Sequence, residues 1–109
     1  MKLGILVVQS KVYQWQSKNT QPGAQIDLVI DRKDDTVNIC EIKYSKDKYS
    51  ITSTYEYELN NKINAFLLET NTKQSIQLTM ITTEGLLHNT HSEAVTNDII
   101  LDNLFTAPL

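Results

Sequence analysis

The sequence has a single cysteine and no excess of positive charge. Cys40 on its own cannot form an intramolecular disulfide, so a reducing, cytoplasmic setting is expected. No apolar run approaches the length that spans a membrane, and the first residues lack the small-residue cleavage site of a signal peptide. The net charge of -3 offers no overall basic field. Any attraction to nucleic-acid phosphate therefore has to come from a local patch.

At 109 residues the chain is long enough for one domain with one core. Its hydrophobic content of 40% and charged content of 21% lie within the range of folded proteins. The only dense basic cluster is Lys43, Lys46 and Lys48. The chain also has no phosphate-binding loop of the form Gly-x-x-x-x-Gly-Lys-Ser/Thr, which excludes a nucleotide-hydrolysing P-loop within these residues.

Side-chain periodicity predicts an α/β fold. Alternating patterns predict strands at 12–16, 24–31, 36–44 and 76–82, and a further strand at 98–101 before a short turn that Asp102 caps and that runs to Phe105. The segment 2–8 is the end of a helix or a buried strand. The connection at 32–35 is short, so the strands on either side of it are expected to be antiparallel.

An amphipathic helix is predicted at 53–69. Apolar side chains recur there at helical spacing, at Tyr55, Leu59, Ile63, Phe66 and Leu67. Ser50, Thr52 or Ser53 is expected to cap its first turn. A helix of this length permits a crossover between parallel strands, so the sheet is expected to be mixed, an antiparallel meander joined to a parallel strand.

Three charged side chains suggest chemistry. Glu41 and Lys43 alternate on one face of a predicted strand, and the paired strand can bring Asp27 beside them. Asp27 and Glu41 are hard oxygen ligands suited to Mg²⁺ or Mn²⁺, and the backbone carbonyl of Ile42 is a further candidate ligand. Such a metal activates water and clamps a phosphate, while Lys43 orients the attacking water.

The same residues have a structural interpretation. Alternating charges on a half-exposed hairpin usually form a solvated face. Val37 and Ile39, however, precede Glu41 and Lys43 on the same face. A face that is apolar at one end and charged at the other is typical of the rim of a site.

Other residues are weaker candidates. His88 and His91 face the same way if their segment is helical, but no third zinc ligand is evident. Cys40 is expected to be a small buried residue rather than a nucleophile. The aromatic residues Tyr13, Trp15, Tyr44, Tyr49, Tyr55 and Tyr57 are explained by packing as well as by contact with nucleic acid.

The order of these elements resembles a known superfamily. A strand, the Asp27 strand, the Glu41-Ile42-Lys43 strand, the amphipathic helix and a further strand are similar to the core of the PD-(D/E)XK nucleases, over 12–82. More narrowly, 23–32 and 40–45 resemble the C-terminal nuclease-like domain of bacterial AAA-type ATPases of the archaeal-ATPase kind. Tyr55, Leu59, Lys62, Phe66 and the ending at 102–105 are similar too.

The resemblance implies a restriction-endonuclease-like fold and specific roles. Asp27 and Glu41 become metal ligands and Lys43 the catalytic lysine. Gln25 and Lys62 become groups that support the ligands or contact phosphate. The superfamily core begins with a helix that often contributes an acid, and here no acid precedes Asp27. The remnant of that helix is expected near 2–4, so the chain is expected to be a C-terminal fragment of a larger ATPase.

Two functions remain open. The first is a metal-dependent phosphodiesterase that cuts DNA. The second is an inactive module of the same fold that binds nucleic acid or docks to its attached ATPase. The intact Asp27, Glu41 and Lys43 favour the first, whereas the missing upstream acid and the negative net charge favour the second. Neither function involves a membrane.

Overall fold

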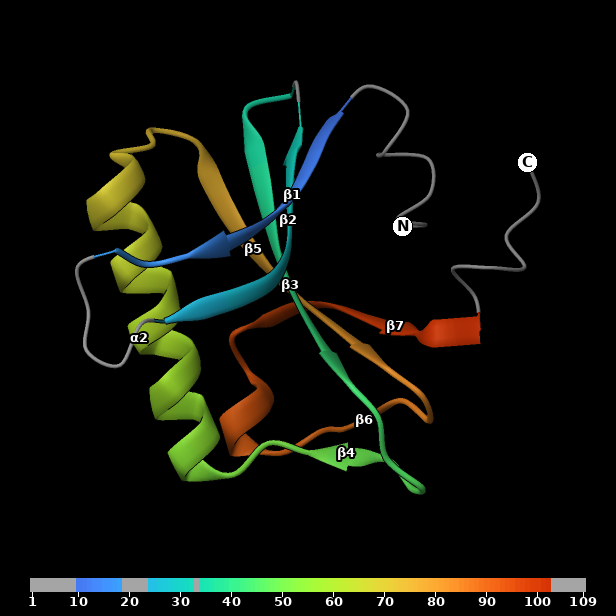
Figure 1. The fold of residues 1–109 in the computed structure, drawn as a ribbon. Helices are drawn as coiled ribbons and strands as arrows, with labels where there is room; N and C mark the ends of the chain where they lie inside the picture. The colour runs from blue at the N-terminus through green and yellow to red at the C-terminus, as the bar shows by residue number, and fades with distance from the viewer. Residues whose placement is uncertain (1–9, 19–23, 33, 103–109) are drawn as a thin grey trace.

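A mixed five-stranded β-sheet with one long helix beside it forms the fold (Figure 1). The computed structural model describes residues 10–18, 24–32 and 34–102. Its regular elements are β1 (Ser10–Gln16), β2 (Gln25–Arg32), β3 (Thr36–Lys43), β4 (Tyr49–Ser50), α2 (Ser53–Thr70), β5 (Ser75–Thr82), β6 (Leu86–Leu87), the 3-10 helix η1 (Thr90–Ser92) and β7 (Val95–Ile100).

The sheet has the strand order β1-β2-β3-β5-β7. β1, β2 and β3 form an antiparallel meander, whereas β5 pairs in parallel with both β3 and β7. The long connection through α2 makes the parallel β3–β5 pair possible. The predicted mixed sheet with a crossover helix is therefore confirmed, and the predicted strand and helix boundaries agree with the structure to within two residues, except for β7.

α2 begins and ends where its sequence provides caps. The Thr52 side chain accepts a hydrogen bond from the backbone N–H of Tyr55 at 3.1 Å. At the other end Asn71 adopts the left-handed conformation (φ 52°), and its N–H bonds the carbonyl of Leu67. Asparagine tolerates this conformation better than most residues. The caps fix where α2 begins and ends.

One face of the sheet packs against α2 through a continuous apolar cluster. Phe66 is 1% exposed and packs edge to face against Trp15, with 5.3 Å between the ring centroids. The remaining buried members are Ile26, Val29, Val37, Ile39, Ile51, Tyr55, Leu59, Leu78, Met80 and Leu86. This cluster holds α2 in register with β3, so the helix can present side chains to the charged end of that strand.

Cys40 lies on the opposite face of the sheet, where it packs with Ile30 and Ile81 in a second buried cluster. Burial raises the pKa of its thiol to about 12, and the negative charge of Glu41 adds to the shift. The expectation of a small buried residue is confirmed, since Cys40 is fully buried.

Native Cys40 is expected to resist alkylation by iodoacetamide. At pH 8 a thiol with a pKa of about 12 is roughly 10⁻⁴ thiolate, against roughly a quarter for an unfolded cysteine with a pKa near 8.5. Labelling in buffer should thus be about a thousandfold slower than in urea, and fast native labelling would contradict the buried placement.

Because the native thiol holds its proton above pH 8.5 while the unfolded one loses it, Cys40 stabilises the fold below pH 8.5, and that contribution declines as pH rises toward 12.

The structure contains two short strands that the sequence pattern did not predict, and its last strand begins earlier than predicted. β4 and β6 pair in parallel as a separate two-stranded sheet, and β7 begins at Val95 rather than at residue 98. Strands of two residues carry no detectable period, so the pattern missed them.

The predictions for 2–8 and for the turn to Phe105 fall outside the described residues. No helix in the described part of the chain has the length and apolar character needed to cross a membrane.

Candidate functional site

The predicted trio lies where β2 separates from β3. These strands pair from Leu28 with Cys40 to Asp31 with Val37. The residues of β2 that precede Leu28 pair with β1 and not with β3. Asp27 is therefore the first residue of β2 past the last β2–β3 pair, and it sits beside the end of β3 that carries Glu41 and Lys43.

A β-bulge in β2 sets the position of Asp27. Tyr13 pairs with Val29 and Trp15 pairs with Ile26, so a two-residue step on β1 matches a three-residue step on β2. The extra residue breaks strict alternation, and both Ile26 and Val29 consequently reach the cluster under α2. Asp27 itself stays exposed. A bulge of this kind re-aims side chains, and here it turns Asp27 toward the gap between the strands.

Glu41 is the most buried member of the trio. Its side chain is 1% exposed, and its carboxylate accepts three hydrogen bonds. The ammonium of Lys62 donates to Oε1 at 2.6 Å, the hydroxyl of Tyr55 donates to the same oxygen at 3.2 Å, and the backbone N–H of Asp27 donates to Oε2 at 3.2 Å. A buried carboxylate is stable only with such partners. The predicted supporting residue Lys62 thus contacts a predicted ligand directly.

Asp27 is tied to the same place by a reciprocal contact. Its Oδ2 accepts a hydrogen bond from the backbone N–H of Ile42 at 2.9 Å, while its own N–H bonds Glu41. Each carboxylate is therefore bonded to the main chain of the opposite strand. The structure brings Asp27 and Glu41 together across the gap, as the strand pattern predicted, and the contact with Ile42 is made by its N–H rather than by the carbonyl predicted as a metal ligand.

Tyr55 has a role at the site that the sequence analysis did not assign to it. Its hydroxyl bonds Glu41, and its ring lies 4.6 Å from the ammonium of Lys43, which packs over its face. Burial raises the pKa of this phenol, and the charge of Glu41 raises it further, so Tyr55 remains a hydrogen-bond donor. The helical spacing signalled only burial. A buried tyrosine nevertheless needs a partner for its hydroxyl, and the nearby Glu41 supplies it.

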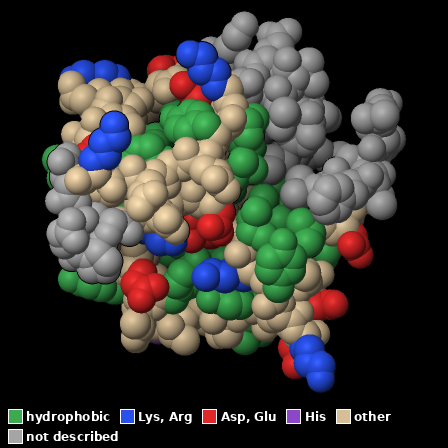
Figure 2. Space-filling view, viewed as in Figure 1, with side chains coloured by type: hydrophobic (Ala, Val, Ile, Leu, Met, Phe, Trp, Pro, Cys, Tyr) green, Lys and Arg blue, Asp and Glu red, His purple; other side chains and the backbone are tan. Residues whose placement is uncertain are grey.

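Gln25 lines a cleft next to Asp27. The cleft has a volume of about 300 Å³ and is bordered by Gln14, Trp15, Gln16, Gln25, Ile26 and Asp27. No contact joins Gln25 to Glu41 among the contacts that the described residues make. In the space-filling view, acidic and basic side chains lie next to one another near the middle of the visible face, with apolar surface beside them (Figure 2).

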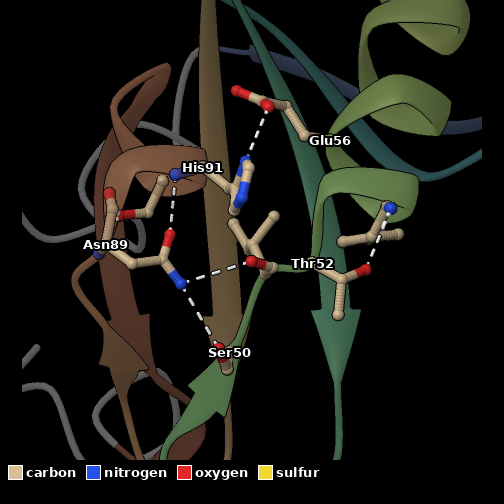
Figure 3. Close-up of polar contacts among 8 residues, drawn as sticks. Ser50, Thr52, Glu56, Asn89 and His91 are labelled. Carbon is tan, nitrogen blue, oxygen red and sulfur yellow. Dashed lines mark hydrogen bonds and ion pairs between the residues drawn. The ribbon is translucent and has the colours of Figure 1, made fainter.

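The two histidines do not form a zinc site. His91 lies in η1, and its Nδ1 is 2.9 Å from the Glu56 carboxylate on α2 (Figure 3). The neighbouring Asn89 caps η1 and donates to Ser50 Oγ and to the carbonyl of Ile51. These contacts fasten η1 to the start of α2. Across 10–18, 24–32 and 34–102 no three metal-ligating side chains come together.

Four of the five tyrosines fall into two groups, and the fifth, Tyr13, is 38% exposed on β1. Tyr44 and Tyr57 are 74% and 67% exposed, which leaves them open to a partner. Tyr49 packs edge to face on Tyr55 with 5.9 Å between centroids. Tyr55 is 7% exposed, so it serves packing and Glu41 rather than stacking on a base. Trp15 likewise packs on the core.

The donor set fits a hard divalent cation. Mg²⁺ is often held by one or two carboxylates, with water and substrate phosphate completing its shell. Asp27 and Glu41 bring two carboxylates to the gap between β2 and β3, where Asp27 is exposed to incoming ligands and Oε1 of Glu41 already accepts hydrogen bonds from Tyr55 and Lys62. The absence of a third acid among the described residues is compatible with this mode of binding.

Comparisons with family models, with curated proteins and with solved structures find no match.

Proposed function

We propose that this chain is a metal-dependent phosphodiesterase domain acting on DNA, with Asp27 and Glu41 as ligands for Mg²⁺ or Mn²⁺. The observation that carries the proposal is the buried Glu41 carboxylate, held by three donors next to the exposed Asp27. A charge buried at the end of a strand is costly to the fold unless it is paired. Its position beside a second acid at a strand gap is typical of a site rather than of a solvated face.

The arrangement of elements supports the proposal. The antiparallel meander, the crossover helix and the parallel strand follow the order of the PD-(D/E)XK core, with the acid on β2 and Glu-x-Lys on β3. We infer a restriction-endonuclease-like fold on that basis. A bound metal supplies a more acidic water and a clamp for the scissile phosphate.

The protein's own groups then position the reactants. Lys43 is held by the face of Tyr55 and keeps its ammonium at the charged end of β3. There it orients the attacking water and offsets negative charge on the phosphate. Tyr55 and Lys62 hold Oε1 of the Glu41 carboxylate, so Oε2, on the side of Asp27, is the proposed metal-binding oxygen. The backbone carbonyl of Ile42 is the proposed third protein ligand.

A second candidate function is an inactive module of the same fold. The 2.6 Å contact between Lys62 and Glu41 favours it, because this ammonium already balances the buried carboxylate without a metal. The negative net charge points the same way. In that case the domain binds nucleic acid or docks to an attached AAA-type ATPase, and the ion pair serves only the fold.

Titration of Mn²⁺ by calorimetry separates the two functions. We expect saturable binding by the natural chain and at least about a tenfold loss of affinity in Asp27→Asn, which removes one charge from an exposed side chain that supplies a metal ligand. The matched control is Asp47→Asn, the same chemical change at another exposed position, which should bind as the natural chain does.

The outcomes lead to different conclusions. Absence of saturable binding by the natural chain rejects the phosphodiesterase. Binding that Asp27→Asn leaves unchanged rejects this site. Binding by the natural chain that is accompanied by nicking of plasmid DNA, with both lost in Asp27→Asn and nicking lost in Lys43→Met, supports the proposed roles.

A further inference from the structure

Three glutamines, Gln14, Gln16 and Gln25, border the cleft beside Asp27. Trp15 and Ile26 are cross-strand partners that face α2, so Gln16 and its partner Gln25 face the other side of the sheet. Gln14 precedes Trp15 on β1 and therefore faces the same side as Gln16 and Gln25. The cleft lies at the end of the β1–β2 pair that extends past β3, and Asp27 borders it from the bulge.

The side-chain amides of these glutamines are available to hydrogen-bond a ligand. All three glutamines are exposed, and in the described part of the chain their side chains make no hydrogen bond. A side-chain amide offers a donor and an acceptor side by side, which matches the edge of a nucleobase. Neutral amides also differ from the lysines and arginines that dominate contacts to phosphate. The lining therefore suits a base better than a phosphate group.

The size of the cleft restricts its occupant. A volume of about 300 Å³ lies at the small end of ligand sites, which suits one nucleotide rather than a duplex. Asp27 lies both on the rim of this cleft and in hydrogen-bond contact with Ile42 and Glu41. A strand whose phosphate lies at Asp27 and Glu41 would thus bring a neighbouring base to the glutamines.

We propose that the cleft formed by Gln14, Gln16 and Gln25 binds one unpaired nucleobase of the DNA strand, next to the phosphate held at Asp27 and Glu41. The inference rests on the proposed function in one respect, namely that the bound strand is DNA. The match between the glutamine amides and a base does not depend on that function. It makes single-stranded or distorted DNA the preferred substrate class, because a paired base is stacked and cannot enter the cleft.

The single tryptophan provides the readout. Trp15 borders the cleft, so its fluorescence is expected to change when the four 2′-deoxynucleoside 5′-monophosphates are titrated without metal. At least one should bind more tightly than 2-deoxyribose 5-phosphate, which has the phosphate and no base. Gln16→Ala combined with Gln25→Ala should weaken that nucleotide by about tenfold or more, from the loss of two amide contacts. Asn64→Ala, an exposed amide on α2, is the control and should change nothing.

The outcomes separate this inference from the proposed function. Equal binding of the sugar phosphate and all four nucleotides, or full binding by the double glutamine variant, overturns the base-binding cleft. A base preference shown by the natural chain, when that chain fails to bind Mn²⁺, supports the cleft while rejecting the phosphodiesterase. Mn²⁺ binding without any base preference gives the reverse result.

Discussion

Replacing Lys62 by methionine should lower the free energy of unfolding by about 3 kcal/mol, because it leaves the Glu41 carboxylate buried without its cation. Glu41 is 1% exposed, and Lys62 is 22% exposed at its side chain. The partial exposure of the lysine sets the expected loss at the lower end of the range for broken buried pairs. Urea denaturation followed by Trp15 fluorescence measures the change.

Two further variants show that the loss comes from an unpaired charge. Lys73→Met removes an exposed lysine and should change stability by less than about 0.5 kcal/mol. Glu41→Gln in the Lys62→Met background removes the orphaned charge and should recover most of the loss, since neutral replacement of a buried pair is often tolerated. A Lys62→Met chain as stable as the natural one would show that the ion pair contributes nothing.

The same variant connects stability with function. If Asp27 and Glu41 hold a divalent cation, Mn²⁺ replaces the missing ammonium and should stabilise Lys62→Met by about 2.7 kcal/mol at a hundred times its dissociation constant. Asp27→Asn in that background should abolish the gain. A Lys62→Met chain that Mn²⁺ leaves unchanged would favour the inactive module, in which the ion pair is purely structural.

Periodicity was sufficient to predict the elements that carry the site. Alternation placed Glu41 and Lys43 on one face of β3, and helical spacing placed Phe66 and Leu59 against the sheet. These predictions held because each element is long enough to show its period and buries one face. The length of the α2 connection likewise implied the parallel β3–β5 pair.

The finer features of the site could not be predicted in this way. The bulge at Asp27 depends on a register difference between β1 and β2, and nothing in the local sequence marks it. The role of Tyr55 depends on two residues far apart along the chain, since its hydroxyl reaches Glu41 on β3. Local propensity reports which face is buried, whereas such contacts are set by how the elements pack.

Replacing Phe66 by alanine should cost about 3 to 5 kcal/mol, the usual range for deleting a buried aromatic ring. The ring is 1% exposed and packs on Trp15, so its loss leaves a cavity between α2 and β1. Leu68→Ala is the matched control. Its side chain is 82% exposed on the same helix, and its removal should change stability by less than about 0.5 kcal/mol.

The cavity should also weaken the site, because Phe66 lies one helical turn beyond Lys62 and on the same face. A shift of this turn of α2 is expected to loosen the 2.6 Å contact of Lys62 with Glu41. Phe66→Leu combined with Lys62→Met should therefore cost less than the sum of the two single changes, by about 0.5 kcal/mol or more, as coupled neighbours do. Strict additivity in urea denaturation would show that Phe66 anchors the helix without holding the Glu41 site.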